Sequence, residues 1–132
     1  MKALIKTLLV GIGLFSIFSC TMIREADYGF PKTVEFSNEG GEKIVKGDEG
    51  HCCGAEIYDP KGNKSQYDSG VYEDDIKYFQ YEWLKVEYKL TYHNTINEIK
   101  IIAEPNHSGK TRQLDILLYG GTDRQTIGVV QD

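Results

Sequence analysis

The feature that most constrains the fold is the alternation of apolar and polar side chains in "WLKVEYKLTY", residues 83–92. From position 84 to position 92 every second residue is aliphatic or aromatic, and lysine, glutamate or threonine stands between. A period of two places each set on one face of an extended chain, whereas a helix needs apolar spacings of three and four. The segment therefore predicts a half-buried β-strand.

Further short segments read as strands, and they are separated by turn-forming sequences such as "NEGGE", "DPKGN", "PNHSG" and "YGGTD". No stretch after position 20 has the period of a helix. We therefore expect an all-β fold, an antiparallel β-sandwich of about seven strands, with a small barrel as the alternative. The other predicted strands are residues 33–36, 42–46, 54–59, 98–103, 113–119 and 126–131.

The N-terminus has the pattern of an export signal. Two lysines precede the apolar run "LLVGIGLFSIFSC", which is shorter than the ~20 residues of a membrane span. Its end, "IFSC" at 17–20, resembles a bacterial lipobox, which implies cleavage after residue 19 and acylation of Cys20. The alternative is a soluble secreted protein that is cut at an ordinary site. Stable anchoring takes two or more acyl chains, so a triacylated Cys20 would bind the membrane permanently.

The predicted mature chain forms one domain. We expect residues 1–19 to be the signal peptide, residues 20–31 a lipidated tether and residues 32–132 the folded domain. Residues 21–31 could span ~36 Å when extended. Loss of the signal peptide's two lysines leaves 13 basic against 20 acidic residues, a net charge of −7. This balance argues against nucleic acid as a partner, because phosphate contacts need clustered cations.

Four segments follow one another in the order "VEFSNEGGEKIVK", "EWLKV", "IIAEPNHSGKTRQLDILLYGG" and "IGVVQD". Together they resemble the BACON domain, a bacterial immunoglobulin-like module of proposed carbohydrate-binding role. The resemblance spans about residues 33–131 and implies an antiparallel immunoglobulin-like β-sandwich. From the residues themselves, Asn106 and Gly109 are expected to form a turn, and Arg112 to brace that turn or pair with Glu104.

The stretch "YDSGVYEDDIKYFQYEW", residues 67–83, is the candidate ligand site. Exposed rings can stack on the apolar faces of sugars, and carboxylates can accept hydrogen bonds from sugar hydroxyls. The candidate ligand-binding residues are Tyr72, Tyr78, Tyr81, Trp83, Asp74 and Asp75. The alternatives are a long loop whose aromatic residues pack on the core, a protein contact, or a calcium site formed by the acidic residues.

The motif "HCCG" at 51–54 allows three interpretations. One cysteine of a strand points inward and its neighbour outward, which predicts a buried Cys52 or Cys53 beside a free thiol. A soft metal bound with His51 and an intermolecular disulfide are the alternatives. We predict no cofactor and no metal. No catalytic motif is present, so we expect the protein not to be an enzyme.

Two non-catalytic functions remain from the sequence. The first is glycan binding by a lipid-anchored domain, with polysaccharide as the ligand. The second is a scaffold or spacer that contacts an envelope protein through a flat face or an edge strand. The segment after Cys20, "TMIREAD", lacks a strongly acidic cluster, so the periplasmic face of the outer membrane is favoured over the cell surface.

Overall fold

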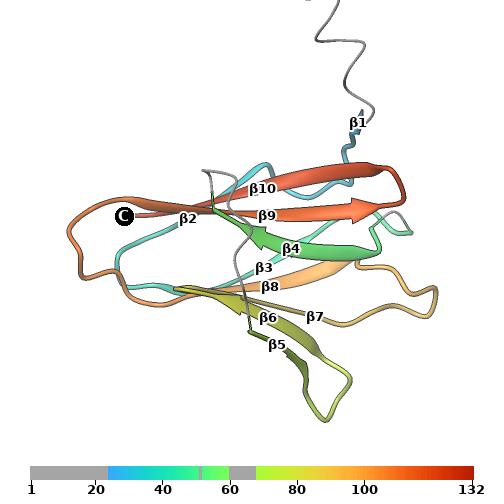
Figure 1. The fold of residues 1–132 in the computed structure, drawn as a ribbon, viewed down its shortest axis with the longest axis horizontal. Coiled ribbons are helices and arrows are strands. Elements are labelled where there is room, and N and C mark those ends of the chain that lie inside the picture. Colours follow the sequence, from blue (N-terminus) through green and yellow to red (C-terminus); the bar gives the residue numbers. More distant parts are fainter. Residues whose placement is uncertain (1–23, 51, 60–67) are drawn as a thin grey trace, which may run out of the picture.

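The computed structural model describes residues 24–50, 52–59 and 68–132. They form two facing β-sheets (Figure 1), and every regular element among them is a strand. One sheet has the order β1-β10-β9-β4, with β2 also paired to β10; the other has the order β3-β8-β7-β6-β5. The predicted all-β immunoglobulin-like sandwich is confirmed.

The strands are short, and most neighbours are antiparallel. Among the described pairs, only β1 with β10 and β2 with β10 are parallel. The elements are β1 (Arg24–Glu25), β2 (Thr33–Phe36), β3 (Gly41–Lys46), β4 (Gly54–Tyr58), β5 (Asp68–Val71), β6 (Lys77–Tyr81), β7 (Leu84–Tyr88), β8 (Glu98–Ala103), β9 (Arg112–Gly120) and β10 (Asp123–Gln131).

The core lies between the sheets and consists of the apolar residues that the alternation places on the inner faces. In β7, for example, Leu84 and Val86 are fully buried, while Lys85 and Glu87 point to the outer face. Strand β7 ends at Tyr88, before the predicted end at 92. The other inward residues include Val34, Phe36, Ile57, Phe79, Ile99, Ile101, Leu114, Ile116, Leu118, Ile127 and Val129.

The sandwich has three strands more than the seven predicted ranges. Two of them, β5 and β6, form a hairpin from residues that the sequence suggested to be a loop. This hairpin extends the lower sheet beyond the upper one (Figure 1). Few of its side chains therefore contact the opposing sheet. Among its described strand residues, only Phe79 is buried in the core.

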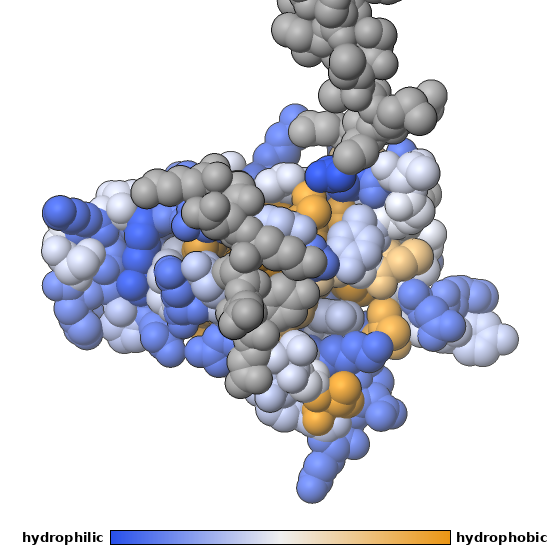
Figure 2. Space-filling model, in the orientation of Figure 1, coloured by the Kyte–Doolittle hydropathy of each residue, from blue (hydrophilic) through white to orange (hydrophobic). Residues whose placement is uncertain are grey.

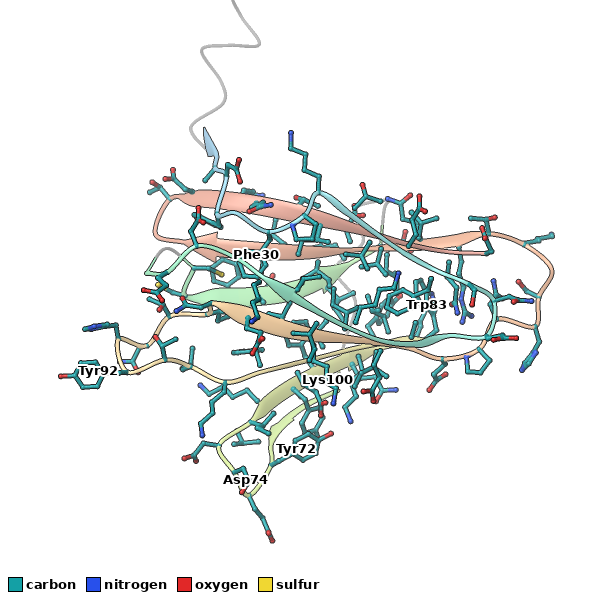
Figure 3. All side chains as sticks on the ribbon, turned by 180° about the vertical axis from the view of Figure 1, so that it is seen from behind. Phe30, Tyr72, Asp74, Trp83, Tyr92 and Lys100 are labelled. Carbon is teal, nitrogen blue, oxygen red and sulfur yellow. The ribbon has the colours of Figure 1, made fainter. Side chains whose placement is uncertain are left out.

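The third additional strand, β1, begins a segment that was expected to be a tether, and that prediction is wrong for residues 24–31. Tyr28 and Phe30 are buried in the core. Gln125 holds both of them: its Oε1 accepts the Tyr28 amide at 2.7 Å and its Nε2 donates to the Phe30 carbonyl at 2.7 Å. The segment is folded because its alternate side chains close one end of the sandwich, where Figure 3 shows Phe30 between the sheets.

The predicted signal peptide and Cys20 lie outside the described residues. Within the described residues, no helix has the length and apolar character needed to cross a membrane.

The turn between β8 and β9 confirms the predicted structural roles. Asn106 Oδ1 accepts the Ser108 amide at 3.1 Å, and Gly109 has a φ of 75°. Arg112 donates to the carbonyls of Glu104 and Pro105, so it braces the turn. Its Nε also donates to the fully buried Gln131 at 2.9 Å. These bonds join the turn to the last strand.

Candidate functional site

The outer face of the β3-β8-β7-β6-β5 sheet is the candidate ligand surface. The strand register places Tyr78 opposite Glu87, Glu87 opposite Lys100, and Lys100 opposite Ile44. These four residues therefore form one row across four strands, on the face away from the core. The row combines an aromatic ring, one charge of each sign and an aliphatic side chain.

A pair of tyrosines stands at one end of this row. The rings of Tyr72 and Tyr78 stack with centroids 4.6 Å apart and an interplanar angle of 20°. A Cβ placed on Gly70, the cross-strand partner of Tyr78, would lie 2.7 Å from the Tyr78 hydroxyl. Gly70 therefore lets the Tyr78 ring lie directly on the β5 backbone. Tyr72 is 38 % exposed, so the pair offers an aromatic surface to solvent.

Lys85 fixes the tyrosine pair. Its ammonium donates a hydrogen bond to the Tyr72 hydroxyl and lies 5.0 Å from the centroid of each ring. The hydrogen bond to Tyr72 is the main reason why the pKa of Lys85 is raised, because it favours the charged form. Cation–π attraction between the Lys85 ammonium and the two rings also stabilises the orientation of the rings. Lys85 thus supplies a positive charge and a hydrogen-bond donor beside the rings.

A groove of about 250 Å³ continues from the row of charges. Ile44 and Ile76 give it an apolar part, and Glu87, Lys100 and Glu98 give it polar groups. Lys100 also pairs with Glu42 at 3.3 Å, and Lys46 with Glu98 at 3.9 Å, so the charges beside the groove are largely balanced. Such a mixed surface can hold a neutral, hydroxyl-rich ligand better than a strongly charged one.

The acidic candidates lie at the tip of the β5–β6 hairpin. Asp74 and Asp75 are both exposed, and Asp75 has a positive φ of 60° in the tight turn. Figure 3 shows Asp74 at this tip, beyond Tyr72. Among residues 24–50, 52–59 and 68–132, no group of three or more His, Cys, Asp or Glu side chains could hold a metal ion.

Trp83 and Tyr81 do not belong to this surface, and their prediction as exposed ligand-binding rings is wrong. Trp83 is 6 % exposed and points between the sheets (Figure 3), where the Arg112 guanidinium lies 4.6 Å from its ring. Tyr81 packs partly buried against the core. Tyr81 ends β6, and Glu82 and Trp83 form the two-residue turn before β7. Glu82 has a φ of 51° in this turn, so the chain reverses there and the Trp83 ring points inward.

Of the two adjacent cysteines, one is buried and the other exposed, as the alternation predicted. Cys52 is fully buried, and its thiol donates to the Gly54 carbonyl at 3.4 Å; Cys53 is exposed. Burial raises the pKa of Cys52 to about 11. Cys52 is thus a packing residue at neutral pH and Cys53 a free thiol, while His51 lies outside the described residues.

A second groove, of about 570 Å³, lies between the edges of the two sheets at β2 and β3. Lys43 crosses it from β3, donates to the Glu35 carbonyl of β2 and lies 5.1 Å from the Phe36 ring. Inward-pointing charges on edge strands oppose the addition of a further strand. Lys43 therefore disfavours a protein contact by strand addition at this edge.

Lys85, Glu87, Lys100 and Ile44 were not among the sequence candidates. The signal was present in the alternation of residues 83–92, since Lys85 and Glu87 share the face that carries Tyr78. It was interpreted as an ordinary solvated face because the neighbouring strand β6 had not been recognised. Figure 2 shows the side of the sandwich where β4 and the β5–β6 hairpin lie, and there apolar side chains form small separate areas among hydrophilic ones.

No family model and no curated protein matches this chain. A structure determined by NMR of a protein from Bacteroides thetaiotaomicron is similar at 15 % sequence identity, with a TM-score of 0.46. The similar region covers 83 % of this chain and 86 % of that one.

Proposed function

We propose that the protein is a cell-envelope lipoprotein, acylated at Cys20, whose immunoglobulin-like sandwich is a non-catalytic glycan-binding module. The observation that supports this most strongly is the Tyr72–Tyr78 pair beside a groove that crosses the outer sheet face. The resemblance of residues 33–131 to BACON modules favours the same class of ligand. The sequence after Cys20 favours the periplasmic face of the outer membrane.

The surface offers the two kinds of contact that a sugar needs. The exposed part of the Tyr72 ring can stack on the C–H face of one sugar ring. Lys85 and Lys100 can donate hydrogen bonds to hydroxyls, and Glu87 can accept them. Because Tyr78, Glu87 and Lys100 lie in one row across the strands, a linear glycan would cross the sheet.

Affinity electrophoresis in gels loaded with single polysaccharides tests this proposal. We expect at least one polysaccharide to retard the wild-type domain and Tyr72→Ala to weaken that retardation. An aromatic contact of about 1 kcal/mol corresponds to a roughly fivefold loss of affinity. Val71→Ala is the matched control, because Val71, the last residue of β5, is also exposed but lies on the sheet face opposite to that of Tyr78. Absence of retardation across a broad panel, or equal losses in both variants, would contradict the proposal.

A protein-contact module is the second candidate function, and it is favoured by Ile44. This side chain is 61 % exposed, ends the row on the edge strand β3 and lines both grooves. If a polypeptide is the ligand, Ile44→Ser should abolish co-purification of a specific envelope protein, and polysaccharides should leave migration unchanged.

A further inference from the structure

We propose that the end of the sandwich carrying Tyr92 faces the bilayer and that Tyr92 inserts into a zwitterionic membrane interface. This inference rests on the acylation of Cys20 in the proposed function. It adds an orientation and a second contact to the lipid anchor.

The folded part of the chain begins close to the predicted anchor. The backbone of Arg24, in β1, already pairs with Asp123 of β10, and only three residues lie between Arg24 and Cys20. The four steps from Cys20 to Arg24 span at most ~14 Å. A linker of this length keeps the start of β1 near the lipid headgroups. The expected tether of residues 20–31 would instead have allowed the domain to stand away from the membrane.

Tyr92 lies at the same end of the molecule as β1. The β7–β8 loop that carries it is joined at its base to Gly47 and Cys52: the Gly47 amide donates to the Asn97 carbonyl, and the Ile96 amide donates to the Cys52 carbonyl. The Asp48 amide in turn donates to the Tyr28 carbonyl. Figures 1 and 3 show β1 and this loop at one end of the sandwich, with Tyr92 at the tip of the loop.

Tyr92 is held outward by an ordered turn. Its ring is 92 % exposed and contacts His93 edge-on, with centroids 4.6 Å apart. The Thr91 and Thr95 hydroxyls share a hydrogen bond of 2.7 Å, and the Thr95 carbonyl accepts the Thr91 amide at 2.9 Å. A fixed, solvent-exposed tyrosine is suited to a membrane interface, where tyrosine rings are enriched because one end is apolar and the other polar.

One ring is too small to recruit a free protein, but it can orient an anchored one. The short linker gives the ring a high effective concentration at the membrane, so a contact of about 1 kcal/mol changes the ratio of orientations roughly fivefold. The same end exposes Asp27, Asp48 and Glu49. These carboxylates would be repelled by anionic lipids, and for this reason the proposed surface is zwitterionic.

Quenching by brominated lipids tests the orientation in the full lipidated protein. Tyr92→Trp places a reporter at the proposed contact. His107→Trp places the control in the exposed β8–β9 turn at the opposite end of the sandwich. Trp83 is buried and gives both variants the same background. Each variant is reconstituted into vesicles of dibrominated or unbrominated phosphatidylcholine, and flotation with the vesicles shows whether the anchor is present.

We expect both variants to float, and brominated lipid to reduce and blue-shift the emission of the Tyr92→Trp variant only. If both float but bromination affects the two equally or not at all, the orientation is wrong while the anchor stands. If neither floats and mass spectrometry finds no acyl groups on Cys20, the anchor fails and the orientation with it. Glycan retardation of the soluble domain is independent of all three outcomes.

Discussion

Replacement of Phe30 by alanine tests whether the segment after β1 belongs to the folded domain. Phe30 is 4 % exposed and lies among core residues. Its ring also lies on the backbone at Gly47, where an added Cβ would be 2.3 Å from the ring. The neighbouring position thus has no side chain to fill the space that the ring would leave.

The expected destabilisation follows from this packing. Phenylalanine-to-alanine substitutions in cores cost about 3–5 kcal/mol. Because Gly47 has no side chain that could fill the cavity, we expect a loss in the upper half of this range. A domain of this size has a free energy of unfolding of about 5–15 kcal/mol. With a urea m-value of about 1–3 kcal/mol/M, the midpoint of unfolding should move down by roughly 1–5 M.

Urea unfolding of residues 21–132, followed by the fluorescence of the buried Trp83, measures this shift. Lys32→Ala is the control, because Lys32 is exposed two residues away and should change stability by less than about 0.5 kcal/mol. A Phe30→Ala variant as stable as the control would refute the reasoning, since only a free tether tolerates loss of the ring.

Three further predictions concern the cysteines and the β8–β9 turn. Native protein treated with iodoacetamide at pH 8 should be alkylated at the exposed Cys53 and not at the buried Cys52, as read by peptide mass spectrometry. Because the Cys52 pKa is raised from 9.0 to about 11, its contribution to stability is complete below pH 9 and is lost as the pH rises towards 11. Urea midpoints over this range should fall less steeply in Cys52→Ala. Asn106→Ala should cost about 2–4 kcal/mol in the same assay, because its buried amide group donates to Lys110 and Asp132; a loss under about 0.5 kcal/mol would contradict that role.

The sandwich itself could be predicted because its central strands meet a core on one face and solvent on the other. Strands such as β7 and β9 therefore alternate clearly in the sequence. The hairpin β5–β6 lies at the edge of its sheet, where Tyr78 and Gln80 face solvent and Tyr81 is only partly buried. Its tip turns at Asp75 without a glycine. Alternation and turn chemistry, the two signals for a hairpin, were both weak there.

The N-terminal segment was missed for a different reason. Ala26, Tyr28 and Phe30 alternate and all pack on the core, so the period of two was present. The pattern covers only three side chains and ends at a Phe-Pro pair, so the segment showed no clear period and was interpreted as a tether. The site was predicted in part: Tyr72 and Tyr78 come together, whereas Trp83 is turned inward by the positive φ of Glu82. A backbone reversal of this kind is not visible in the composition of the stretch.

The most direct test of glycan binding on the outer sheet face is an NMR titration of the isotope-labelled domain with soluble oligosaccharides from the retarding polysaccharide. We expect amide shifts that cluster at Tyr72, Tyr78, Lys85, Glu87 and Lys100, with no shifts in β10 of the opposite sheet. Saturable shifts that centre on any other surface, or no shifts at millimolar ligand, would contradict it.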